Sequence, residues 1–447
     1  MPSEGRVKDS MLVRVIVIGL IVVALMVPVS MIGFLVYERE TRRDEAVREI
    51  GAMWAAPQLL SGPILALPYR CDPPKGSPLA ECLALLQVHP KTLTITGILE
   101  PEVRTRSLFR AVVYKAKVKV TAMFVPEAGY ANPAPVELLW SRATVNMGLS
   151  DPRGVTSAVE LVSGDTRSKF VPGVAAGLHM MTGMKALVGN APAAGNGEYH
   201  ATFEFELNGT RDISFSDLGD NAVVRFESSW PHPSFIGSAL PSTRTSESEG
   251  FTAEWRTGTF WRAAVASSAL EDGSPRAVPT RAESPATFGV ALITPVDVYQ
   301  QTSRAVKYAV LFIGATFLVA FLWEVTRGVL VHPVQYAFVG FALCVFYLLL
   351  LSISEHAGFD PAYAIASAAT VLQLSWYWRW VAGGRAQGGV MALILSGLYG
   401  FLYLLLRLED YALLAGSVGL FVALIAVMFL TRKVNWHQLG KPPVSGT

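Results

Sequence analysis

The chain has 447 residues, of which 51% are hydrophobic and only 16% are charged. Roughly a quarter of the residues of an ordinary soluble protein are charged, so long uncharged apolar segments must account for the deficit. The formal net charge of +2 gives no reason to expect a nucleic acid partner, and three cysteines are too few for a disulfide-rich scaffold.

The first apolar run extends from Val15 to Tyr37. A bilayer core about 30 Å thick needs about 20 helical residues, so this run is long enough to cross. A cleaved signal peptide would have a shorter apolar stretch of about 7–15 residues and a small-residue cleavage site, whereas this run continues as GFLVYERE. We therefore expect an uncleaved anchor, with residues 1–37 forming the cytoplasmic tip and the first transmembrane helix.

Residues 38–50, ERETRRDEAVREI, follow the anchor and carry charges of both signs. Glu38/Arg42 and Asp44/Arg48 are opposite charges four residues apart, a spacing that stabilises an exposed helix. We expect the first helix to continue out of the membrane as a solvated segment. A surface that docks a partner or lipid headgroups is the alternative.

Residues 38–304 are predicted to form a β-rich domain. In LFRAVVYKAKVKVTAMF (108–124) apolar residues alternate with lysines, which is typical of a strand with one buried face. The stretches at 199–207 and 251–257 alternate in the same way. Asn208-Gly209 follows the first of these, and because this pair favours a two-residue turn we expect a hairpin there.

Cys71 and Cys82 flank a proline-rich turn with an apolar arm on each side, at 64–69 and 83–88. If these arms pair as a hairpin, the two sulfurs meet across its mouth. An oxidising exterior would then allow a disulfide, and closing a loop of about ten residues would contribute about 2–3 kcal/mol. Free thiols are expected if the domain is cytoplasmic instead. Cys344 lies within an apolar segment and is read as a packing residue.

The last third of the chain is predicted to contain five more transmembrane helices. Their expected ranges are 305–326, 334–353, 361–377, 388–406 and 412–430. The connections are short, so successive helices must run antiparallel. Ser396/Gly400 and Ala412/Gly416 are pairs of small residues that predict close packing of the last two helices.

The charges between the helices predict the orientation, because lysine and arginine are retained in the cytoplasm. The basic positions Arg327, Arg379 and Arg385 and those in the tail after residue 430 fall on one side. The acidic positions Glu355, Asp360, Glu409 and Asp410 fall on the other side, where Arg407 is the only base. The first helix alone could insert either way, but six crossings place both termini in the cytoplasm.

The predicted organisation is thus an α+β membrane protein with six transmembrane helices and a large periplasmic domain between the first and second. Its parts are residues 1–37, a periplasmic domain at 38–304, a five-helix bundle at 305–431 and a cytoplasmic tail at 432–447.

SSWPHPSFIGS, residues 228–238, contains a histidine between two prolines. Proline fixes its own φ and biases the preceding residue toward extended backbone, so a stiff extended segment is expected. Zinc would need three or four ligands, and the other histidines of the domain, His89, His179 and His200, show no ligand spacing. We favour a docking clip on the extracytoplasmic side over a metal or catalytic site. Its residues would be Trp230, Pro231, His232, Pro233 and Phe235.

Three ionisable residues, Glu324, Glu355 and His356, lie in or at the edge of the predicted helices, where such groups are functional candidates. Glu324 has a simpler interpretation as the partner of Arg327, three residues later. Glu355 and His356 lie just after the third predicted transmembrane helix, at 334–353. With Tyr347 and Asp360 they could form a proton relay or a polar contact to the β-rich domain. A satisfied helix end is the simpler interpretation for them.

Four motifs occur in order along the chain: SSWPHPSFIGSALPSTR, GFTAEW, TPVDVYQQTSRAVKYA and HPVQYAFVGFALCVFYLLLLSISEHAGF. With these motifs the sequence resembles the CreD family of Gram-negative inner-membrane proteins, also called cell envelope integrity inner membrane proteins. The resemblance covers most of the chain, is strongest at 228–359 and is weak at about 79–198. The cysteine-flanked turn is not expected of the family in general.

The resemblance implies a role in envelope integrity under a two-component regulon that responds to stress or β-lactam antibiotics. The family has no established reaction, cofactor or ligand, so there are no catalytic residues to carry over. We expect a non-enzymatic protein of the inner membrane without metal or cofactor. Its partners would be the bilayer and an envelope component or another membrane protein, and not nucleic acid. The alternatives are a transporter or small-molecule conduit formed by the C-terminal helices, an envelope hydrolase, and a membrane adaptor that modulates a sensor kinase.

Overall fold

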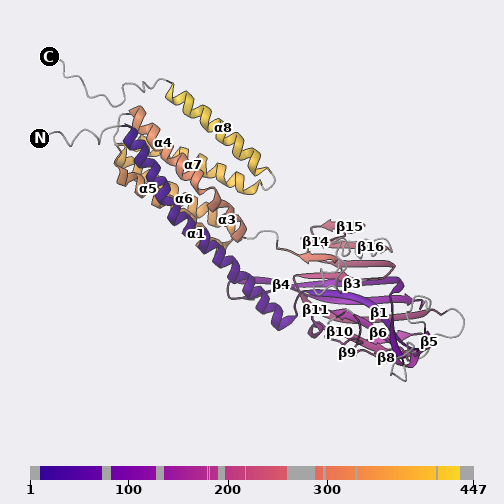
Figure 1. Cartoon of the computed structure of the whole chain (residues 1–447). Helices are drawn as coiled ribbons and strands as arrows, with labels where there is room; N and C mark the ends of the chain where they lie inside the picture. Colours follow the sequence, from indigo (N-terminus) through magenta and orange to yellow (C-terminus); the bar gives the residue numbers. More distant parts are fainter. Residues whose placement is uncertain are drawn as a thin grey trace, which may run out of the picture. The chain divides into compact units, whose positions relative to one another are not determined.

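A computed structural model shows a mixed α+β protein with a large β-rich region and several long apolar helices (Figure 1). The structure describes residues 11–72, 82–126, 135–178, 180, 182–189, 197–216, 218–258, 287–294, 298–327, 331–408 and 411–432. The chain divides into two compact units. The helical unit comprises Met1–Arg42 and Val296–Thr447, and the β unit comprises Arg43–Pro295.

The helices of the described chain are α1 (Met11–Trp54), α3 (Val298–Lys307), α4 (Ala309–Arg327), α5 (Pro333–Ala357), α6 (Phe359–Val381), α7 (Arg385–Arg407) and α8 (Ala412–Thr431). Five of them, α1, α4, α5, α7 and α8, are long and apolar enough to cross a membrane. The remaining predicted span forms α6, which has the same length as α7. Asp360, Gln373 and Arg379, with two serines and one threonine, interrupt the apolar residues of α6.

The first helix continues past the apolar run to Trp54, as its charge pattern predicts. Glu38 and Arg42 form the expected ion pair at 2.6 Å, whereas Asp44 pairs with its neighbour Arg43 at 2.8 Å. The start of the second predicted span is wrong, because residues up to Lys307 form the separate helix α3. Its buried residues recur every three positions among polar ones, so α3 is amphipathic and distinct from the apolar α4.

Aromatic and aliphatic side chains from α1, α4, α5, α6 and α7 form the core of the helical unit. The first helix approaches α5 closely at Gly340, where an added Cβ would lie 2.1 Å from a methyl group of Leu25. By contrast, α8 has no buried residue. The prediction that Gly400 packs closely against α8 is wrong, because open space surrounds Gly400 and the contact runs from Gly419 to Phe401.

The β unit contains two sheets. The first has nine strands in the order β14-β17-β12-β1-β6-β10-β9, with β2 and β5 also pairing with β1. The second has eight strands in the order β15-β16-β13-β3-β4-β11-β7-β8. The strands are β1 (Gln58–Cys71), β2 (Cys82–Val88), β3 (Pro90–Arg106), β4 (Phe109–Phe124), β5 (Pro135–Leu138), β6 (Thr144–Leu149), β7 (Glu160–Ser163), β8 (Thr166–Lys169), β9 (Val171–Pro172), β10 (Gly183–Leu187), β11 (Tyr199–Thr210), β12 (Asp212–Ser216), β13 (Asn221–Ser228), β14 (Pro233–Gly237), β15 (Thr243–Glu247), β16 (Gly250–Gly258) and β17 (Phe288–Leu292).

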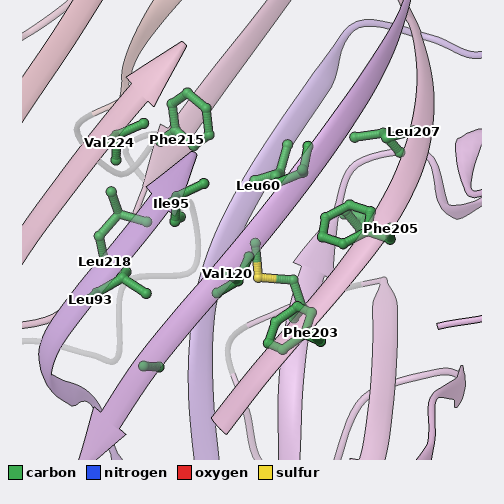
Figure 2. Packing of buried hydrophobic residues seen from close by; sticks show 14 of the residues in the cluster. Leu60, Leu93, Ile95, Val120, Phe203, Phe205, Leu207, Phe215, Leu218 and Val224 are labelled. Atoms are coloured by element: carbon green, nitrogen blue, oxygen red, sulfur yellow. The ribbon is translucent and has the colours of Figure 1, made fainter. Parts of the chain in front are cut away.

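The two sheets share one hydrophobic core, so they pack face to face as a sandwich. Figure 2 shows part of this interior, with Leu60 of β1, Val120 of β4 and Phe203 of β11 among its side chains. The predicted alternation in β4 is confirmed, since its alternate residues from Tyr114 to Phe124 are buried while its lysines are exposed. Burying the apolar face of each strand is what drives the sandwich to form.

The hairpin predicted at Asn208-Gly209 is wrong. Both residues remain in β11, paired with Lys115 and Tyr114 of β4. The chain turns at Arg211, in the left-handed region with φ 66°, and enters β12 of the other sheet. Gly209 is needed for another reason, because an added Cβ would lie 2.2 Å from the hydroxyl oxygen of Tyr114.

The arms around the first two cysteines pair as β1 and β2, from Leu65 opposite Val88 to Cys71 opposite Cys82. Cys71 and Cys82 form a disulfide at the mouth of this hairpin. The turn at 73–81 lies outside the described residues. Cys344 is buried in the helical unit as a free thiol, which agrees with its interpretation as a packing residue.

Candidate functional site

The Trp230–Phe235 segment carries the chain from β13 in the eight-stranded sheet to β14 at the edge of the nine-stranded sheet. The Trp230 indole donates a hydrogen bond to the Ile293 carbonyl oxygen at 2.8 Å, and the Ile293 amide donates to the His232 carbonyl at 3.3 Å. Phe235 packs edge-on against Trp255, with ring centroids 5.8 Å apart. These contacts make the segment a clip between the sheets, while its docking role stays a prediction.

The His232 side chain is exposed and Pro231 and Pro233 are half-buried. Within the described part of the chain, no group of three or more His, Cys, Asp or Glu side chains could hold a metal ion. His179, one of the histidines considered from the sequence, lies outside the described residues.

Glu324 is buried in the helical unit, with a side chain 7% exposed, and its partners differ from the predicted one. One carboxylate oxygen accepts a hydrogen bond from Arg14 of α1, and the other accepts from the Tyr336 hydroxyl of α5 at 3.0 Å. Arg327 instead stacks over the Trp323 ring at 5.3 Å. Sequence proximity misled the prediction, because buried carboxylates need partners that converge from several elements.

A cavity of about 460 Å³ adjoins this carboxylate. The cavity is lined by Val13, Arg14, Val17, Ile18, Glu324, Val331, His332, Pro333 and Tyr336. His332 caps α5, since its Nδ1 accepts the Val334 amide hydrogen at 3.3 Å and the Gln335 side chain accepts the His332 amide hydrogen at 2.9 Å. Four polar side chains thus meet an apolar wall at one end of three helices.

Glu355 and Asp360 belong to separate polar clusters, so the proposed relay is not assembled. Glu355 lies 3.7 Å from Arg39 and accepts a hydrogen bond from the Tyr299 hydroxyl at 3.2 Å. Asp360 instead accepts hydrogen bonds from Arg407 and Tyr403 at the end of α7. His356 is exposed, and the acidic position Glu409 lies outside the described residues.

Two arginines of α1, Arg14 and Arg39, therefore bind acids at opposite ends of the helical unit. Arg14 and Arg39 are 25 residues apart in one helix, which corresponds to about 37 Å along its axis. Arg14 lies at the start of α5 and Arg39 at its end, so α1 runs parallel to α5 and antiparallel to α4.

The outer face of the eight-stranded sheet carries two adjoining hollows, which we call the sheet groove. One, of about 740 Å³, is lined by Thr96, Gly97, Ile98, Lys117, Val118, Lys119, Ser157, Ala158, Glu204, Phe205, Glu206, Arg225 and Glu227. The other, of about 490 Å³, is lined by Ile98, Glu227, Ser228, Ser229, Thr245, Glu247, Glu249, Gly250, Phe251 and Thr252. Ile98 and Glu227 belong to both hollows, and Ile98 is 51% exposed between them.

Charges of both signs line the sheet groove. Lys119 pairs with Glu204 at 2.7 Å and Arg225 with Glu227 at 2.8 Å. The hydrogen bond from Lys117 lowers the pKa of Glu100, and the same bond raises the pKa of Lys117. The lysine face of β4 is visible in the sequence but this groove is not. Glu204 and Glu206 come from a strand more than 80 residues later, and only strand pairing brings them beside the lysines.

A further polar cluster, missed from the sequence, holds the segment that joins α1 to β1 within the β unit. The buried Asp151 carboxylate accepts hydrogen bonds from Arg153 at 2.7 and 2.8 Å and from the Ala56 amide at 3.0 Å. The Gln58 amide group donates to the backbone oxygens of Asp151 and Asn208. Only the folded sandwich brings these residues from three segments together.

Comparison with known proteins places the chain in a family. The family model described as inner membrane protein CreD matches residues 10–437. The inner membrane protein CreD of Escherichia coli K12 is 30% identical over 437 residues, covering 95% of this chain and 94% of that protein. The chain belongs to the CreD family of inner membrane proteins. Its apolar helices and this membership together establish a multi-pass protein of the inner membrane.

Solved structures similar to part of the chain include an M1 zinc metallopeptidase from Deinococcus radiodurans. A mutant form of that enzyme is 11% identical with a TM-score of 0.21, and the match covers 38% of each chain. The enzyme without that mutation is 8% identical with a TM-score of 0.18. Likeness this weak carries no conclusion about the fold or the activity of this CreD-family chain.

Proposed function

We propose that this CreD-family protein supports cell envelope integrity and the response to envelope stress or antibiotics without catalysing a reaction. Its β unit would act in the periplasm by docking an envelope component in the sheet groove. The groove carries this proposal, because two adjoining hollows lined by charged side chains, with an exposed aliphatic centre at Ile98, suit an extended polar chain. Alternating charges along its walls would fix the register of such a chain.

The proposed topology has six transmembrane helices with both termini in the cytoplasm. Five of these are the long apolar helices, and α6 is the additional one. Its pairing with α7 supports the proposal that α6 also crosses the membrane. Asp360 at the start of α6 binds Arg407 at the end of α7, and Gly388 at the start of α7 packs against Arg379 near the end of α6. The two helices therefore lie antiparallel along their whole length, so if α7 crosses the bilayer α6 crosses with it.

The periplasmic placement of the β unit rests on two kinds of support. Lysine and arginine concentrate in the connections that six crossings place inside. The Cys71–Cys82 disulfide also suits an oxidising compartment, since disulfides persist in the periplasm and are rare in the cytosol.

A substitution in the groove tests the proposed function. Ile98→Lys places a cation at the centre of the groove, where the side chain is half-exposed and its change should leave the core intact. Expressed in cells that lack their own copy, this variant should fail to protect against β-lactams and detergent. Leu187→Lys on β10 is the matched control, being 56% exposed on the other sheet, and should protect fully. Full protection by Ile98→Lys at equal abundance would contradict docking in the groove.

A photo-crosslinking amino acid can distinguish between the two candidate docking surfaces, the sheet groove and the Trp230–Phe235 clip. Placed at Ile98 in intact cells it should capture an envelope component, and placed at His232 it should capture little. Efficient capture from His232 alone would move the docking site to the Trp230–Phe235 clip. Capture of a sensor kinase from Ile98 would favour the adaptor alternative.

A transporter is the second candidate, favoured by the cavity beside Glu324. The double substitution Glu324→Gln and Glu355→Gln removes the buried carboxylate of Glu324 and the partly buried one of Glu355 while keeping the side-chain shapes. Normal envelope protection by this variant would argue against transport through a charge relay.

A further inference from the structure

The Glu324 cavity combines features that a lipid headgroup site requires. Its volume of about 460 Å³ falls in the ordinary range for small-molecule sites. It lies at the ends of the apolar helices α1, α4 and α5, where a bilayer places its headgroups. The α1 side chains Val13, Val17 and Ile18 supply an aliphatic wall against which an acyl chain can lie.

The two charged side chains of the cavity, Arg14 and Glu324, can hydrogen-bond a ligand while they remain paired with each other. A carboxylate has about four acceptor positions, and Glu324 uses one on each oxygen, for Arg14 and for Tyr336. A guanidinium has five N–H donors, and the Arg14 side chain is 30% exposed. The His332 Nδ1 accepts from Val334, so in the neutral ring Nε2 is the donor.

The opposite charges select the class of ligand. A simple anion would be attracted by Arg14 but repelled by Glu324. A simple protonated amine would be attracted by Glu324 but repelled by Arg14. A headgroup with a phosphate and a primary ammonium satisfies both, since the phosphate accepts from Arg14 and His332 while the ammonium donates to Glu324. A primary ammonium also donates directional hydrogen bonds, which a quaternary ammonium cannot.

We propose that this cavity binds a phospholipid whose headgroup joins a phosphate to a primary ammonium, as in phosphatidylethanolamine. Bound there, the lipid contacts α1, α4 and α5 together and holds the N-terminal anchor against the C-terminal helices. This site is independent of docking in the sheet groove, so either can fail without the other.

Native mass spectrometry of the full-length protein from mixed micelles measures the retained lipid. The probes are phosphatidylethanolamine, phosphatidylcholine and phosphatidylglycerol, offered in equal amounts. The unsubstituted protein should retain phosphatidylethanolamine above both others. Glu324→Gln should reduce the preference for phosphatidylethanolamine over phosphatidylglycerol on the order of tenfold, the usual effect of losing one charged hydrogen bond. Arg14→Gln should reduce retention of all three.

Glu355→Gln is the matched control, because it removes the acid at the other end of the unit and should leave the lipid preference unchanged. Competition by soluble headgroup compounds on the unsubstituted protein gives a test that does not depend on the folding of a variant. Glycerophosphoethanolamine should displace the bound lipid better than glycerophosphoglycerol or inorganic phosphate. Equal retention of the three lipids, or displacement by phosphate alone, would overturn the proposal.

Discussion

Gly209 and Asp151 show how neighbours decide what one residue does. Gly209 follows an asparagine and looks like a turn residue, yet its lack of a side chain makes room for the Tyr114 ring. The buried Tyr114 hydroxyl donates to the Asp212 carbonyl at 2.8 Å, and burial raises the pKa of Tyr114 well above its usual value. The Tyr114 hydroxyl thus holds the chain where it leaves β11 for β12.

Asp151 gives a prediction on acid stability. Its hydrogen bond from Arg153 lowers the pKa of Asp151 from 3.8 to about 2. A lowered pKa means that the stabilisation is complete well above pH 3.8 and is lost as the pH falls toward 2. Asp151→Asn should therefore cost about 1–2 kcal/mol at neutral pH and make the unfolding free energy less sensitive to acid.

Chemical unfolding of the full-length protein in detergent, measured from about pH 6 down to about pH 3, checks this expectation. Asp165→Asn, in the exposed turn after β7, is the control and should change neither the midpoint nor its pH dependence. Equal behaviour of the two variants would rule out a stabilising role for the Asp151 cluster.

At the scale of elements, local pattern identified strands and helices but not their partners. The paired arms β1 and β2 are the exception, because they follow one another closely in the chain and so meet readily as a hairpin. The chain after β11 crosses between sheets, and α3 separates from α4, because burial against other elements decides where a segment ends.

The β1–β2 hairpin gives a prediction about the disulfide. Reduction should lower the unfolding free energy of the β unit by about 2–3 kcal/mol, since it releases the loop between residues 71 and 82. Thermal unfolding with and without dithiothreitol measures the loss. The double variant Cys71→Ser and Cys82→Ser should unfold, with or without dithiothreitol, at the same temperature as the unsubstituted protein treated with dithiothreitol. Insensitivity of the unsubstituted protein to dithiothreitol would contradict the expectation.

For the whole molecule, α1 is the one described helix whose residues belong to both units. Within the helical unit its arginines bind Glu324 and Glu355, acids on two other helices. This arrangement fixes the direction of α1 relative to α5, a point that the charges around α1 leave open in the sequence.

The six-helix topology gives a prediction about α6. Single cysteines at His356 and at Ala382, each in a Cys344→Ser background, flank α6. A thiol reagent that cannot cross lipid should label the first in intact spheroplasts and the second only after permeabilisation. Identical labelling of both positions would show that α6 does not cross.

The family resemblance, the apolar helices, the alternation of the long strands and the cysteine hairpin can all be predicted from the sequence. Each depends on composition or on residues close in the chain, where periodicity reports directly on burial. The folded chain is needed to show which acid meets which arginine, how β4 and β11 build the sheet groove and why residue 209 must be glycine. Those facts depend on residues far apart in sequence, and a local pattern carries no record of which distant side chain will supply the charge, the hydrogen bond or the ring that a buried group requires.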